Sequence, residues 1–137
     1  MPRTSTIRRV LVITLAPATV AILMAPALLF ADAANDQVFL AKVWPIIDKN
    51  CTGCHGADKQ KGKLRLDSRD GWIMGGEDGP IVVEGAPEKS DVILAIKYMA
   101  KDDDHNMPPK KKTRLTADQV DMLSQWIKAG LPWPDKK

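Results

Sequence analysis

One short motif constrains this chain more than any other feature: Cys51-Thr52-Gly53-Cys54-His55, a C-x-x-C-H sequence. This spacing is typical of covalent attachment of a c-type haem. The two thiols are placed to add to the two vinyl groups of the porphyrin, and His55 follows directly, where its imidazole can bind the iron. A buried haem is the largest apolar body that a small domain can hold, so we expect it to act as the core.

Two other interpretations of the cysteine pair are weaker. A structural zinc site needs four ligands, and outside the motif the chain offers only His105 and no further cysteine. A thioredoxin-like redox pair belongs in a strand–turn–helix setting, whereas this motif follows a segment with a helical pattern. We therefore expect one covalent haem c held by Cys51 and Cys54, with His55 as an axial ligand of the iron.

The N-terminus has the pattern of an export signal. Residues 1–33 begin with three arginines among the first nine positions, continue with an apolar run from Val10 to Phe30, and end in Ala31-Asp32-Ala33, the small-x-small pattern of a cleavage site. The apolar run is also long enough to span a bilayer, so an uncleaved membrane anchor is the alternative. In either case we expect residues 34–137 to form one haem domain outside the cytoplasm, in the periplasm.

The charges of this domain argue against nucleic-acid binding and leave the role of one basic run open. Residues 34–137 carry a formal charge of only +1, compared with +3 for the whole chain, which argues against a nucleic-acid-binding protein. No spaced pair of carboxylates stands out as an acid–base apparatus. A basic run, Lys110 to Lys112 with Arg114, either attracts an acidic redox partner or is a solvated charged segment, and Asp102 to Asp104 lie close by.

Hydrophobic periodicity and capping residues predict an all-α domain with short extended segments. Ser68, Ser90 and Thr116 are the predicted N-caps, the last in a capping box with Gln119, and Pro45 should kink or restart the first helix. Helices are expected at about 35–43, 45–51, 69–74, 91–99 and 116–129, and extended runs at 64–66 and 81–83.

The second axial position of the iron decides what a haem protein does. Met107 is the predicted sixth ligand, because it lies in a loop and two prolines that follow it stiffen the chain. A thioether suits low-spin iron with a comparatively high potential. The alternatives are that His105 binds instead, that the site is open, or that Met107 only fills a gap in the core.

The chain resembles the planctomycete-type cytochrome c domain, a branch of the class I cytochrome c family, from about Phe39 to Pro134. The resemblance is carried by Cys51-Thr52-Gly53-Cys54-His55-Gly56, Leu64-Arg65-Leu66-Asp67, Gly75-Gly76, Gly79-Pro80, Glu84-Gly85, Ser90, Met107-Pro108-Pro109, Leu115-Thr116, Trp126-Ile127, Gly130 and Trp133-Pro134. It implies an all-α fold in which the first and last helices cross near the haem. It also implies thioether bonds from Cys51 and Cys54, with His55 as the proximal and Met107 as the distal ligand.

These observations predict an electron carrier and not an enzyme. The expected function is transfer of single electrons between exported redox proteins through a haem ligated by histidine and methionine. The alternatives are an electron-transfer subunit of a larger respiratory or dehydrogenase complex, and a haem enzyme or sensor with a displaceable sixth ligand. Contact with a membrane is expected only if residues 1–33 stay attached. Arg65 and Trp72 are candidates for contacts with the haem propionates, although Trp72 fits an ordinary core position equally well.

Overall fold

The computed structural model describes residues 34–134, and this part of the chain is helical, with no strand. The predicted all-α class is therefore confirmed, while the predicted signal or anchor at residues 1–33 lies outside the described residues. The elements follow in the order η1 (Phe39–Val43), α2 (Trp44–Ile47), η2 (Asp48–Thr52), η3 (Lys61–Lys63), α3 (Arg69–Met74), η4 (Pro87–Lys89), α4 (Asp91–Ile96), η5 (Asp103–His105) and α5 (Ala117–Lys128).

The first helical segment continues through Pro45, where a kink or a restart of the helix was predicted. Residues 34–38 are α-helical and run through η1, α2 and η2 without leaving helical geometry. Both η1 and η2 are π-helical turns, so the Trp44 amide donates to the Phe39 carbonyl five residues earlier. Proline lacks an N–H and crowds the carbonyl four residues before it. The wider turn shifts the hydrogen bonds by one residue at that point, and the helix passes through the proline.

The predicted cap of α3 is confirmed. The Ser68 hydroxyl accepts a hydrogen bond from the Gly71 amide at 3.2 Å, as an N-cap residue should. The helix ends at Gly75, which has a φ of 77°. At that position an added Cβ would lie 2.1 Å from the Gly79 carbonyl oxygen, so the close return of the chain requires glycine.

The prediction for α4 is wrong in two respects. Ser90 does not cap the helix with its side chain. Its buried hydroxyl instead accepts from the Val83 amide and donates to the Ala86 carbonyl, both at 2.9 Å, and so ties down the preceding extended run. The helix also ends at Ile96, before the predicted Met99, because Tyr98 adopts a φ of 60° in the left-handed region.

The last helix, α5, is the best predicted element. Thr116 and Gln119 form both halves of the capping box, and the side chain of Thr116 accepts from the Gln119 amide at 3.3 Å. Gly130, with a φ of 89°, follows the end of the helix as predicted. The predicted extended runs at 64–66 and 81–83 form no strand, and each is held by single hydrogen bonds to its neighbours.

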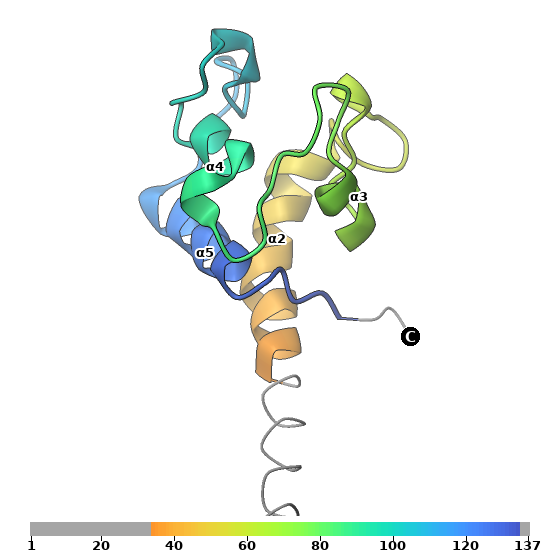
Figure 1. Ribbon diagram of the computed structural model, residues 1–137, viewed down its shortest axis with the longest axis vertical. Helices are drawn as coiled ribbons and strands as arrows, with labels where there is room; N and C mark the ends of the chain where they lie inside the picture. Colours follow the sequence, from red (N-terminus) through yellow and green to blue (C-terminus); the bar gives the residue numbers. More distant parts are fainter. Residues whose placement is uncertain (1–33, 135–137) are drawn as a thin grey trace, which may run out of the picture.

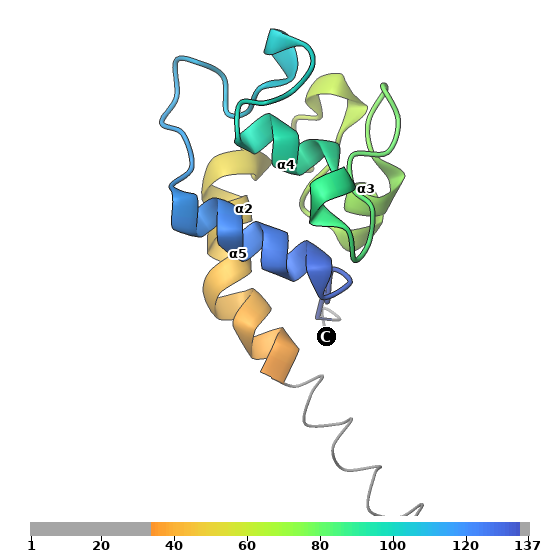
Figure 2. The same ribbon diagram turned by 60° about the vertical axis from the view of Figure 1, so that its left-hand side comes forward.

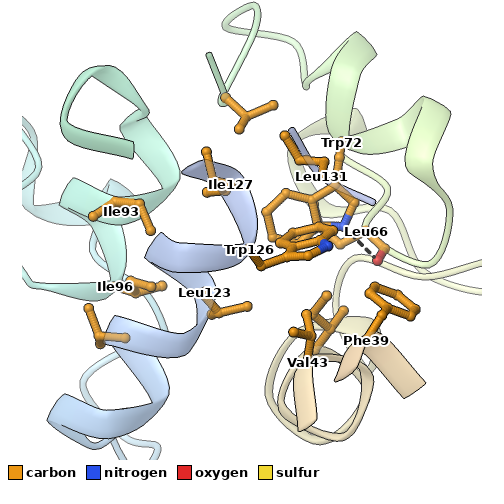
Figure 3. Close-up of a cluster of buried hydrophobic side chains, with 13 residues drawn as sticks. Phe39, Val43, Leu66, Trp72, Ile93, Ile96, Leu123, Trp126, Ile127 and Leu131 are labelled. Atoms are coloured by element: carbon orange, nitrogen blue, oxygen red, sulfur yellow. Dashed lines mark hydrogen bonds between the residues drawn. The ribbon is translucent and has the colours of Figure 1, made fainter. Parts of the chain in front are cut away.

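The helix α5 crosses the first helical segment, which agrees with the arrangement implied by the resemblance (Figure 2). Their contact is aromatic, with the ring of Trp126 in α5 5.8 Å from that of Phe39 in η1. The Trp126 ring also lies 4.9 Å from that of Trp72 in α3. Buried aliphatic side chains of α4 and α5 continue this cluster (Figure 3). Among residues 34–134, thirteen buried hydrophobic side chains form one cluster. The expectation that a haem acts as the core stays a prediction.

The core leaves one end of the molecule for the loops. In Figure 1, the loop that follows α4 and the segment around α3 rise at the same end, on either side of the first helical segment. Within the described residues, no helix is long and apolar enough to cross a membrane.

Candidate haem site

The C-x-x-C-H motif lies at the C-terminal end of the first helical segment. Cys51 is in η2, the last turn, and its carbonyl accepts the amides of Cys54 at 3.0 Å and His55 at 2.9 Å. These two bonds satisfy a helix-terminal carbonyl and hold the second thiol and the imidazole in a tight turn. Both cysteines are half-buried free thiols, so the two sulfurs remain open to modification.

The side chains of the motif are in an apolar setting. Cys51 packs against the hydrophobic core, and burial raises the pKa of its thiol to about 12. His55 is only 9% exposed, and its Nδ1 atom is buried without a hydrogen-bond partner among the described residues. Burial also lowers the pKa of His55, which favours the neutral imidazole that a metal ligand must be.

These groups fit a c-type haem. Thioether formation needs two reduced thiols, and the axial bond needs an uncharged imidazole nitrogen. A buried polar atom without a partner is uncommon in proteins and calls for an explanation such as a missing ligand. The donor set of Cys51, Cys54 and His55 therefore has the chemistry that attachment of a haem requires.

The segment after the motif folds back over it. The Lys61 amide donates to the Cys54 carbonyl at 3.0 Å, and the Leu66 amide donates to the His55 carbonyl at 2.7 Å. The return depends on Gly56, where an added Cβ would lie 2.4 Å from the Thr52 carbonyl oxygen. Such an approach is possible only without a side chain. The sequence signal for this role was the position of Gly56 directly after the motif.

Met107 lies in the loop between η5 and α5. It is half-buried and packs against the core, and its amide donates to the Ala95 carbonyl of α4 at 3.0 Å. The peptide bond to Pro108 is cis. Five residues after Met107, the Lys112 Nζ atom lies 3.9 Å from the Cys54 sulfur. The structure thus brings the loop that carries the predicted distal ligand to the haem motif.

His105 is placed differently from Met107. Its side chain is 55% exposed, and its Nε2 atom lies 3.5 Å from a carboxylate oxygen of Asp78. This environment agrees with the interpretation of His105 as a solvated loop histidine.

The two candidates for propionate contacts have other partners. The Trp72 side chain is 1% exposed and its indole N–H donates to the Leu66 carbonyl at 3.0 Å, so Trp72 is a core residue. The guanidinium of Arg65 forms an ion pair with Asp67 at 2.6 Å, and this contact raises the pKa of Arg65.

Two residues near Met107 were missed by the sequence predictions. Asn106 is buried; its side-chain oxygen accepts from the Ala100 amide at 3.1 Å and its nitrogen donates to Asp103 at 2.9 Å. The Tyr98 hydroxyl donates to the Pro108 carbonyl. The only signal for Asn106 was its place beside Met107, and Tyr98 lies within the helix expected at 91–99.

A surface hollow of about 350 Å³ lies beside the motif. It is lined by Thr52 and Gly53 together with neighbouring polar and apolar residues, and not by Cys51, Cys54, His55 or Met107. The case for a haem site therefore lies in the donor atoms and their contacts.

A helix that ends in C-x-x-C-H is typical of c-type haem attachment, and α5 crosses this helix. Residues 51–111 match the family Planctomycete cytochrome C, which confirms the predicted resemblance over this segment. The match includes the motif and Met107, while the similar features in 112–134 lie outside it. A cytochrome c domain implies haem-based electron transfer. Comparison with curated proteins and with solved structures gives no match.

Proposed function

We propose that this protein is a carrier of single electrons that holds one covalent haem. Cys51 and Cys54 form the thioether bonds, His55 is the proximal ligand and Met107 the distal ligand. When bound, the haem supplies the one-electron chemistry by cycling between ferric and ferrous iron. The protein supplies the attachment, the two axial ligands and the apolar surroundings.

The observation that carries this proposal is the contact between the loop of Met107 and the motif. The Lys112 Nζ atom lies 3.9 Å from the Cys54 sulfur, although the two residues are 58 positions apart. One side chain of the loop that follows α4 therefore reaches the haem motif. His105, the rival ligand, faces Asp78 at 3.5 Å. These placements favour Met107 as the residue that fills the sixth position.

The absorption spectrum of the purified holoprotein tests this assignment. We expect a low-spin spectrum with a thioether-to-iron charge-transfer band, and we expect Met107→Ala to lose that band. Met74→Ala is the matched control, since Met74 is 77% exposed and makes no part of the site. High-spin iron in the wild-type protein, or a band that survives in Met107→Ala, would overturn the proposal.

Mass spectrometry of the mature protein tests attachment and export together. We propose that residues 1–33 direct the chain to the periplasm and are removed after Ala33. The mature protein should then have the mass of residues 34–137 plus one haem. Cys51→Ser together with Cys54→Ser should lack the added mass. A full-length mass in the membrane fraction would instead support an anchor.

We also propose an acidic redox protein as the partner, at a surface that differs from the one predicted. Of the predicted basic run, Lys110 is paired with Asp103 at 2.7 Å and the Arg114 guanidinium lies on the ring of Tyr98. The exposed lysines that remain are Lys111 and Lys112 from this run, of which Lys112 reaches Cys54, and Lys59, Lys61 and Lys63 in the segment that folds back over the motif. We call these five lysines the basic surface.

A further inference from the structure

Tyr98 is the single tyrosine of the chain and has an unusual backbone conformation. It lies two residues after α4 with a φ of 60°, a region that residues other than glycine rarely adopt. Such conformations persist only where the surroundings enforce them, and they cluster at functional sites. The half-buried side chain of Tyr98 donates its hydroxyl hydrogen bond to the Pro108 carbonyl, directly after Met107.

The same ring contacts the far end of the loop. The guanidinium carbon of Arg114 lies 3.5 Å from the centre of the Tyr98 ring, a cation–π contact. Arg114 lies two residues before Thr116, the N-cap of α5. Tyr98 therefore stands at the start of the loop, bonds to its middle at Pro108, and supports its end at Arg114.

Met107 is held on both sides by this arrangement. Its own amide donates to the Ala95 carbonyl at 3.0 Å, and the preceding residue, Asn106, is buried and hydrogen-bonded to the Ala100 amide at 3.1 Å. The following carbonyl accepts from Tyr98. The backbone around Met107 is thus fixed to the end of α4 and the turn after it.

We propose that Tyr98, supported by Arg114, is the positioning residue of the distal ligand. It fixes the Pro108 carbonyl so that the Met107 sulfur stays in place against competing small ligands. A thioether is a weak ligand, so its hold on the iron depends on how little the loop can move. This inference rests on the proposed function of Met107, and Tyr98 itself does not bind the iron.

The test is the binding of imidazole to the ferric holoprotein, which requires displacement of Met107. Tyr98→Phe keeps the ring and removes the hydroxyl, and we expect it to bind imidazole about twofold to tenfold more tightly, the effect of one lost hydrogen bond. Arg114→Gln keeps the hydroxyl and should shift the affinity in the same direction by less. Ser68→Ala is the control, since it weakens the cap of α3 and leaves the loop untouched.

A second measurement tests separately whether Met107 is the ligand and whether Tyr98 positions it. This is the methyl resonance of Met107 in the ferrous protein, which the porphyrin ring current shifts upfield when the sulfur binds the iron. If the wild-type protein lacks this signal, Met107 is not the ligand and both proposals fall. If the signal is present and Tyr98→Phe binds imidazole no more tightly than Ser68→Ala, the role of Tyr98 alone is wrong. If Tyr98→Phe yields no holoprotein, the imidazole affinity of Arg114→Gln is compared with that of Ser68→Ala instead. Binding by Arg114→Gln that is no tighter than by Ser68→Ala would then show that the role of Tyr98 is wrong.

Discussion

At the scale of single residues, Gly56 decides whether the haem motif can close. An added Cβ at this position would lie 2.4 Å from the backbone oxygen of Thr52, which cannot move without disturbing the end of the first helical segment. We therefore expect Gly56→Ala to lower the free energy of unfolding by about 1–3 kcal/mol, as overpacking does. It should also reduce the ratio of haem to protein, because the thiols and His55 belong to the same turn.

Urea unfolding and the haem content of the purified protein measure these effects. Gly53→Ala is the matched control within the motif, because Gly53 has an ordinary φ of −61° and an added Cβ meets no atom within 4 Å. Similar stability and haem content in the two variants would show that the close approach at Gly56 is unimportant.

The residues that we propose to bind the haem could be predicted from the sequence, and the residues that hold the surrounding backbone could not. Cys51, Cys54 and His55 can be recognised by their C-x-x-C-H spacing, because covalent attachment of a haem requires that spacing. Asn106 has no such pattern: its role depends on Ala100 and Asp103 meeting it in a folded turn. The same holds for Tyr98. Its hydroxyl reaches the Pro108 carbonyl because the backbone at Tyr98 adopts the left-handed conformation after α4.

At the scale of elements, α5 is the helix whose start depends most on local sequence. The Thr116 side chain accepts from the Gln119 amide at 3.3 Å, and the Gln119 side chain accepts from the Thr116 amide at 2.9 Å. We expect Thr116→Ala to lower the stability by about 0.5–2 kcal/mol. The measurement is urea unfolding of the holoprotein.

Thr113→Ala serves as the comparison for the α5 cap. Thr113 is an exposed threonine of the preceding loop, and it should change the stability by less than about 0.5 kcal/mol. Equal effects of the two threonine substitutions would contradict the importance of the cap.

Elements with local signals were predicted well, and those decided by tertiary contacts were not. The caps at Ser68 and Thr116 follow from a side chain and a backbone amide three residues on, so the sequence pattern suffices. Ser90 has the same pattern, but its hydroxyl is taken by Val83 and Ala86 in the folded protein. Pro45 was expected to kink or restart the helix, and π-helical turns on both sides of it keep the helix continuous.

At the scale of the whole molecule, the aromatic core and the haem motif occupy different places. Trp126 contacts Phe39 and Trp72 where α5 crosses the first helical segment, and the motif begins in the last turn of that segment, where Cys51 packs against the edge of the core. The number of tryptophans in the sequence could not predict this aromatic cluster, because its rings meet only where two helices distant in the sequence cross.

The proposed function makes the basic surface the expected site of electron exchange with an acidic partner. Lys112 lies against the Cys54 sulfur at 3.9 Å, so its charge is at the edge where the haem is attached. A trivalent anion such as hexacyanoferrate(III) stands in for the acidic partner and should oxidise the ferrous protein faster at low ionic strength. Removing one charge close to the site of exchange should slow this reaction roughly twofold to fivefold, which is the size of a charge interaction of about 1 kcal/mol in water.

Lys112→Gln and Lys61→Gln should therefore slow oxidation by hexacyanoferrate(III) at about 0.01 M salt and have little effect at about 1 M, where screening acts within about 3 Å. Lys128→Gln removes the same charge from the last turn of α5, outside the basic surface, and should behave like the wild type. A trivalent cationic oxidant should show the opposite order, because the lysines repel it. Equal rates for Lys112→Gln and Lys128→Gln at low salt would mean that net charge, and not the basic surface, governs the encounter.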